Sequence, residues 1–337
     1  MDAVEARFWS ELLWAVLGLG LVIYAVTGGA DFGAGVWHIF ARGPRKEAQR
    51  LALREAIAPI WEANHVWMIF AIVVLFSAFP RAFAALCISL HVPIALALIG
   101  IVMRGSAYAF RAYGIQPDRA RREWDRVFAG ASFTTPLFLG AVVGGVSSGE
   151  IRIVDGQVVT GFFAGWTGPF AACVGLFSLA LFAMLAAVYL SADTQGALSD
   201  DFRRRALLME VIAGAFAALT FAMAAWRAPA LFHNLSASRW AGPVQLVTAC
   251  LAVATIALLL ERKPSLARYT AAGQVAMVVV GWGLAMRGHF ILPDMTLERA
   301  SAHPEIMPAL ALALGLGALL LGPALAYLYW VFKRPSP

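Results

Sequence analysis

Long apolar stretches separated by short polar segments dominate this sequence. Each stretch is long enough to cross a bilayer as a helix, which takes about 20 residues. The pattern therefore predicts an all-α polytopic membrane protein with nine transmembrane helices. The predicted spans are roughly 8–40, 57–79, 82–103, 124–146, 162–190, 206–226, 241–260, 265–286 and 308–332.

The polar connections suggest how the predicted helices are grouped. Ser147–Gln157 is polar and glycine-bearing, and it separates the first four spans from the next four. Two four-helix bundles plus one extra helix are the simplest arrangement. The predicted divisions are a first bundle over 1–146, an outside connection over 147–161, a second bundle over 162–286, and an outside loop with the ninth helix over 287–337.

Composition and charge agree with a membrane protein. The 337 residues are 61% hydrophobic and only 14% charged, against about 25% charged in soluble domains. Most of the 26 lysines and arginines fall in loops on one side of the predicted topology. The positive-inside rule then places the N-terminus outside and the C-terminus inside. The net charge of +6 is explained by topology, so no nucleic-acid partner is expected.

The cysteines and the N-terminus do not indicate a catalytic or metal site. Cys87, Cys173 and Cys250 are far apart within apolar runs, so we interpret them as packing residues and expect no metal site. Met1–Arg7 is acidic where a secretory signal would be basic, so we expect the first span to be retained.

The segment IAPIWEANHVW (Ile57–Trp67) carries the most informative polar residues. Glu62, Asn64 and His65 begin an otherwise apolar span, where polar groups are costly to bury. Glu62 and His65 are three residues apart, so they are expected to share a helix face. Pro59 removes a helical hydrogen bond just before them. Glu62 is either a proton relay or a structural, hydrogen-bonded acid.

Asp31 lies among the four glycines of TGGADFGAGVWH (Thr27–His38) in the first span. Glycines allow close helix packing and bending. The carboxylate of Asp31 is either held by neighbouring backbone and an arginine, or is a step in a proton path.

His91 is predicted to lie in the middle of the third span, next to Pro93. Measured from Pro80, the depths of His65 and His91 differ by about 6 Å at 1.5 Å per residue. A haem iron shared by the two histidines is conceivable, which makes His91 a weak cofactor-binding candidate. A histidine in a helix bundle is more often hydrogen-bonded than ligating.

Several of these motifs together resemble subunit II of the cytochrome bd-type quinol oxidases, including the cyanide-insensitive branch. The specific matches are IAPIWEANHVW and VPIALALIGIVMRGSAYAFR (Val92–Arg111). Weaker matches are TGGADFGAG (Thr27–Gly35), YLSADTQG (Tyr189–Gly196) and LPDMTLERAS (Leu292–Ser301). The resemblance covers almost the whole chain.

The resemblance implies a heterodimer in the bacterial cytoplasmic (inner) membrane, in which a partner, subunit I, carries haems b and d. That complex oxidises quinol and reduces dioxygen to water. Subunit II would then be a scaffold that supplies a cytoplasmic proton path. Some members hold a quinone in this subunit, and the sequence leaves open whether a small accessory subunit binds.

By position, Glu62 corresponds to the acid of the family's proton-uptake path, and its neighbours there are Trp61, Asn64 and Trp67. Asp31 and His65 join it as proton-path candidates. Two acids common in the family are missing, because Gly28 and Ala109 occupy their positions.

A stand-alone proton-coupled transporter is the alternative function. Asp31, Glu62 and His65 could couple proton movement to a solute. Transporters often show internal repeats and broken helices. This chain has a glycine-rich first span but no clear repeat.

Overall fold

A computed structural model describes residues 3–57, 61–113 and 118–332. Pro59 and the end of the basic C-terminal tail lie outside these residues, so the predicted loosened turn before Glu62 is not addressed by the structure.

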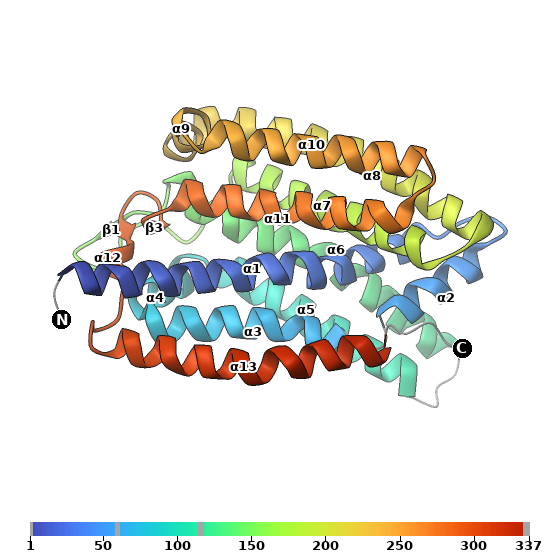
Figure 1. Ribbon diagram of the computed structural model, residues 1–337, viewed down its shortest axis with the longest axis horizontal. Coiled ribbons are helices and arrows are strands. Elements are labelled where there is room, and N and C mark those ends of the chain that lie inside the picture. The colour runs from blue at the N-terminus through green and yellow to red at the C-terminus, as the bar shows by residue number, and fades with distance from the viewer. Residues whose placement is uncertain (1–2, 58–60, 114–117, 333–337) are drawn as a thin grey trace.

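The predicted fold class is confirmed. Within the described ranges, nine helices are long and apolar enough to cross a membrane. They run roughly parallel or antiparallel in stacked layers (Figure 1). They are α1 (Ala3–Ile39), α3 (Trp61–Ala78), α5 (His91–Tyr113), α6 (Asp118–Ser148), α7 (Pro169–Asp193), α8 (Gly196–Arg227), α10 (Ala241–Leu260), α11 (Pro264–Met286) and α13 (Ile306–Phe332).

Shorter elements cover the two ends of the helix stack. One end, which we call the hairpin end, contains the N-terminus of α1 and two small antiparallel hairpins (Figure 1). The opposite end, which we call the basic end, contains α2 and many arginines. The shorter elements are α2 (Lys46–Ile57), α4 (Pro80–Ser89), β1 (Ile153–Val154), β2 (Gln157–Val158), α9 (Pro229–Ala237), β3 (His289–Ile291), β4 (Met295–Thr296) and α12 (Leu297–Ala300).

The third predicted span requires correction, because 82–103 is not one helix. α4 ends at Ser89 and α5 begins at His91. The cause is Pro93, which has no N–H for the carbonyl of Ser89 and whose ring would clash with that carbonyl. His91 therefore begins a helix and does not lie in the middle of one. The tight connection before α4 is as predicted, since α3 ends at Ala78 and α4 starts at Pro80.

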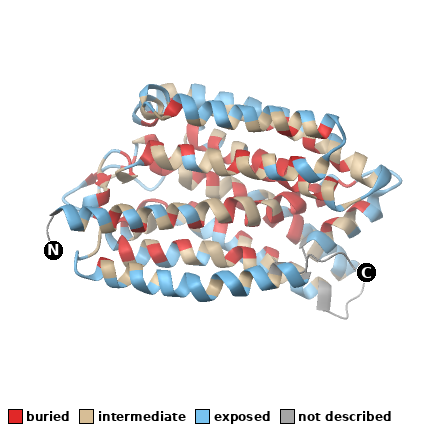
Figure 2. Cartoon of the chain, viewed as in Figure 1, coloured by how far each residue is buried: buried red, intermediate tan, exposed pale blue. Residues whose placement is uncertain are grey.

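α7 is the central helix of the molecule. It packs against α1, α6, α8 and α11, and most of its residues are buried. α13 contacts α1 and α3 from outside, and most of its described residues are exposed. Figure 2 shows buried residues concentrated in the middle layers, whereas α13 is largely exposed. The exposed apolar helices are suited to contact with lipid or a partner protein.

Small residues set the distance between α1 and α7. A Cβ atom on Gly33 would lie 1.9 Å from the carbonyl oxygen of Phe182, and one on Gly29 would lie 2.5 Å from the Phe182 ring. No Cβ atom fits at such distances, so the two backbones approach as closely as glycine allows.

We expect Gly33→Ala to destabilise the protein by about 1–3 kcal/mol or more, the range for overpacking, because the obstructing atom belongs to a helix backbone. Gly18→Ala is the matched control on the same helix, since a Cβ there meets nothing within 4 Å. Thermal unfolding of both purified variants checks this. A Gly33→Ala variant as stable as Gly18→Ala would contradict the close packing described here.

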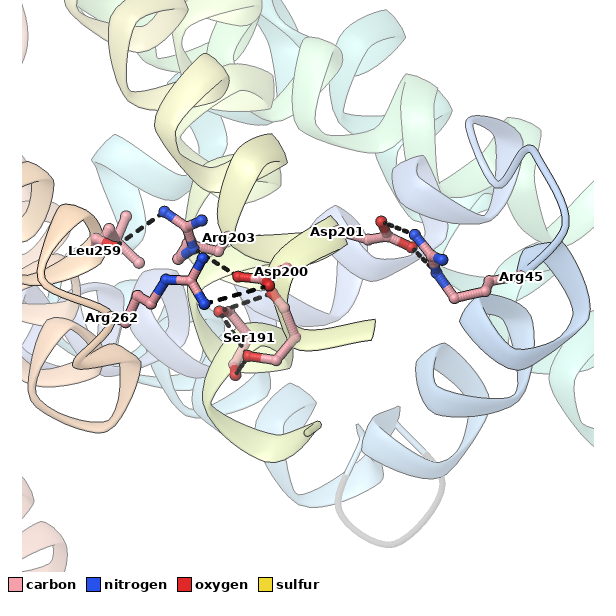
Figure 3. Close-up of polar contacts among 8 residues, drawn as sticks. Arg45, Ser191, Asp200, Asp201, Arg203, Leu259 and Arg262 are labelled. Atoms are coloured by element: carbon pink, nitrogen blue, oxygen red, sulfur yellow. Dashed lines mark hydrogen bonds and ion pairs between the residues drawn. The ribbon is translucent and has the colours of Figure 1, made fainter. Parts of the chain in front are cut away.

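Ion pairs tie the loops together at both ends. At the basic end, Arg45 donates to both carboxylate oxygens of Asp201, and Asp200 pairs with Arg203 and Arg262 (Figure 3). At the hairpin end, Arg152 donates to Asp294 at 2.8 Å, which lowers the pKa of that carboxyl. Because the folded pKa is depressed, this link is present at neutral pH and is lost as the pH falls through the lowered value.

Candidate functional site

Asp31 and Asn64 form the centre of a buried polar network. Asp31 is on α1 and Asn64 on α3, and they are 6% and 2% exposed. The amide Nδ2 of Asn64 donates to Oδ2 of Asp31 at 2.8 Å. Asp31 lies eight residues before the end of α1, so it is about 12 Å from the basic end of that helix. The two sequence candidates are thus brought together at a defined depth.

Arg104, on α5, supplies the positive charge of this network. Its Nη2 donates to the backbone carbonyl of Asp31 at 3.2 Å. Its guanidinium lies 5.0 Å from the centre of the Phe32 ring and 5.4 Å from that of Phe128. At 1% exposure it is the largest fully buried side chain described. The aromatic faces and the nearby carboxylate offset part of the cost of removing this cation from water.

His65 completes the network and has a defined tautomer. Its Nε2 lies 3.2 Å from Nη1 of Arg104, and its Nδ1 lies 3.5 Å from the hydroxyl of Tyr24. A guanidinium can only donate, so Nε2 must accept and the ring proton must be on Nδ1. His65 is therefore a neutral imidazole here, held between a cation and a phenol.

Glu62 does not join these groups. It is exposed in the first turn of α3, whereas His65 is buried. Residues three apart on a helix differ by about 60° in direction, which is enough to place His65 against α1 and Glu62 outside. The expectation that the two residues share a helix face is therefore not met in the isolated chain, where one is exposed and the other buried. Glu62 instead begins an outward stripe that continues with Ile69, Val73 and Phe76.

The remaining sequence candidates have packing contacts. The Trp61 ring lies 6.1 Å from that of His65 and 5.7 Å from that of Tyr108. Trp67 is half-buried and packs on Phe70.

His91 lies outside the network. It is exposed, and its Nδ1 is 2.9 Å from the carbonyl oxygen of Ile88. Both ring nitrogens of His65 face other side chains, so we assign no haem ligand to this pair. Within the described residues, no three His, Cys, Asp or Glu side chains come together as a metal site would require.

A cavity of about 310 Å³ reaches the network from the basic end. It lies between α1, α3, α7 and α11, and an ion pair between Asp193 and Arg268 forms part of its wall near that end. Its lining is mainly apolar, with Asp31 and Asn64 at the inner side. The residues with polar groups that line it are Thr27, Asp31, Asn64, Tyr189, Asp193, Arg268 and Tyr269.

Two parts of the site were missed by sequence reasoning. The third predicted span ends at residue 103, which would put Arg104 in the following inside loop, but Arg104 is buried in α5. The usable signal was the apolar run that continues after it, from Ala107 to Phe110. Tyr24 was not singled out. Its ring lies 2.8 Å from where a Cβ on Gly28 would be, so it fills the space above the position of one missing family acid.

Comparison with known proteins decides the family. The profile described as cytochrome bd terminal oxidase subunit II matches residues 9–332. The chain belongs to the cytochrome bd terminal oxidase subunit II family. The resemblance inferred from the motifs is thereby confirmed.

Two relatives and one solved structure illustrate the similarity to this family. Cytochrome bd-I ubiquinol oxidase subunit 2 of Escherichia coli K12 is 33% identical over 189 residues, which are 55% of this chain and 49% of the relative. Cytochrome bd ubiquinol oxidase subunit 2 of Bacillus subtilis is 30% identical over 133 residues, which are 39% of this chain and 38% of the relative. These matches span half or less of each relative's length.

The fold is also found in the structure of bd oxidase from Geobacillus thermodenitrificans. The TM-score is 0.76 at 22% identity, and the match covers 97% of this chain and 99% of that one. The fold is therefore shared over almost the entire chain. At this identity the match establishes the fold and not the roles of individual residues.

Proposed function

We propose that this subunit II chain is the non-haem subunit of a quinol oxidase. It pairs with a haem-bearing subunit I, and the complex oxidises quinol and reduces dioxygen to water. The observation that carries the proposal, beside the family, is the cavity between the basic end and the buried acid Asp31. Such a cavity suits the passage of protons toward a partner subunit.

The proton route would begin at the basic end. The positive-inside rule makes that end cytoplasmic, with the N-terminus of α1 outside and the C-terminus inside the bacterial inner membrane. Water in the cavity would bring protons to Asp31. Asn64 fixes the orientation of that carboxylate through its hydrogen bond, and the buried cation of Arg104 bonds the backbone carbonyl of the same residue.

Glu62 would act where the two subunits meet. An ionisable side chain that faces lipid is costly, so an outward-facing acid on a spanning helix suggests a protein neighbour. The stripe formed by Glu62, Ile69, Val73 and Phe76 is exposed in the isolated chain. We propose that subunit I covers it, which makes α3 part of the scaffold and places Glu62 between Asp31 and the partner.

Thiol labelling tests the cavity. In a background with Cys87, Cys173 and Cys250 changed to alanine, Ala272→Cys should react with a charged, membrane-impermeant thiol reagent added at the basic end of the complex in inverted membrane vesicles. Val253→Cys is the control: it is at a similar depth on α10 and 66% exposed on the outer surface. Ala272→Cys should label several-fold faster, and equal slow labelling of both would show that the cavity is closed to water.

Purification and one substitution test the function. The tagged chain, purified from its native membrane, should bring haem absorbance with it, whereas a stand-alone transporter would not. Glu62→Gln should keep that absorbance but slow quinol-driven oxygen consumption about tenfold or more, because amides do not transfer protons as carboxylic acids do. Glu123→Gln, an exposed acid at the basic end, should have no effect. Normal turnover in Glu62→Gln would remove this acid from the mechanism.

A further inference from the structure

A second buried acid lies on α8, a helix that supplies no residue to the network around Asp31 or to the lining of its cavity. Glu210 is on α8 and is 4% exposed, and Gln274 is on α11 and is 7% exposed. The amide Nε2 of Gln274 donates to Oε1 of Glu210 at 2.6 Å. α7 packs against both α8 and α11, and Figure 1 shows the helices in neighbouring layers. The hydrogen bond of this pair thus links α8 to α11.

Two acceptor atoms of this pair are left without partners. Oε2 of Glu210 and Oε1 of Gln274 are buried and have no hydrogen-bond partner in the described part of the chain. The residues around the pair on its own helices are small or apolar and fully or almost fully buried: Ala206, Ala213, Ala271 and Val275. Two unsatisfied acceptors in such surroundings are costly, and each needs a hydrogen to bond to.

Among the residues that the structure describes, no charged side chain is placed to stabilise an ionised Glu210. α10 carries no charged residue, and α7 carries none before Asp193. On α11, Arg268 binds Asp193. On the preceding turns of α8, Arg203 binds Asp200, Arg205 donates to Gln49, and Arg204 is exposed. No ion pair in the described ranges includes Glu210. A carboxylate with a single amide donor in a membrane interior is poorly compensated.

We propose that Glu210 is a proton-binding site and is held as a neutral carboxylic acid. The proton on Oε2 turns an orphan acceptor into a donor, which then satisfies Oε1 of Gln274 directly or through one water molecule. Proton and amide together complete the hydrogen bonding of the pair. The ligand of the site is therefore a hydrogen ion, bound in the second helix group. The proposal does not depend on the proton route through Asp31.

Infrared spectroscopy of the intact complex tests this site. At neutral pH the wild type should show the carbonyl stretch of a protonated carboxylic acid that is absent in Glu210→Gln. Gln274→Leu should keep this band but shift its frequency, because one hydrogen-bond partner is lost. An unchanged band in Glu210→Gln, or loss of a carboxylate band in its place, would overturn the proposal.

Stability measurements keep the proposal testable if a variant folds poorly. Glutamine at position 210 can also donate to Oε1 of Gln274, so Glu210→Gln should unfold at nearly the wild-type temperature. Glu210→Ala and Gln274→Leu each leave one buried group unpaired and should unfold at lower temperature. A Glu210→Gln complex as unstable as Glu210→Ala would show that the site requires an ionised carboxylate and holds no proton.

Discussion

Replacing Asp31 with asparagine should lower quinol-driven oxygen consumption by on the order of a hundredfold, within the range that a positioned proton-transfer group contributes. Asparagine has nearly the same shape and can still accept the hydrogen bond from Asn64, so the fold and haem content of the complex should be retained. The loss then reflects the missing ionisable group. Steady-state turnover of the purified complex measures it.

Thr27→Val provides the matched control for that experiment. Thr27 lines the same cavity on α1, and its hydroxyl donates to the carbonyl of Ile23 within its own helix. Its removal changes the cavity wall without removing a titratable group. Turnover near the wild-type value is expected. If Thr27→Val and Asp31→Asn lose activity equally, the cavity wall matters and the acid does not.

Replacing Arg104 with methionine should cost about 3–5 kcal/mol of stability, because it leaves the buried carboxylate of Asp31 without the cation that interacts with it. The substitution also leaves the carbonyl of Asp31 and Nε2 of His65 without their donor. Thermal unfolding of the complex measures this loss. The exposed Arg119, on α6, gives the control Arg119→Met, which should change stability by no more than about 0.5 kcal/mol.

Arg104→Lys separates charge from shape. Lysine keeps the positive charge but lacks the planar group that lies near Phe32 and Phe128 and donates in two directions. Partial recovery of stability is expected. An Arg104→Met complex as stable as the wild type would show that the buried cation has no structural role.

The fold could be predicted because hydropathy alone limits the choices. Apolar runs of membrane length must become helices, since lipid offers no hydrogen bonds to the backbone. The predicted helix ends were less accurate. α8 begins at Gly196, ten residues before the predicted span. The arginines at its basic end can be part of the helix because their long side chains carry the charges to the membrane interface.

The candidate site was only partly predictable. Asp31, Asn64 and His65 were found because polar residues in apolar spans are rare. Their pairing with Arg104 was not, because it depends on how α1, α3 and α5 are packed. The spacing of Glu62 and His65 was compatible with a shared face. Their side chains point about 60° apart around the helix, and only tertiary packing decides which of the two is buried.

The most direct test is time-resolved proton uptake by the reduced complex when it meets oxygen, measured with a pH dye on the side of the basic end. We predict that the wild type takes up protons from that side and that Asp31→Asn does so far more slowly, with haem content unchanged. Uptake by Asp31→Asn at the wild-type rate would contradict the proposal that this subunit conducts protons through its buried acid.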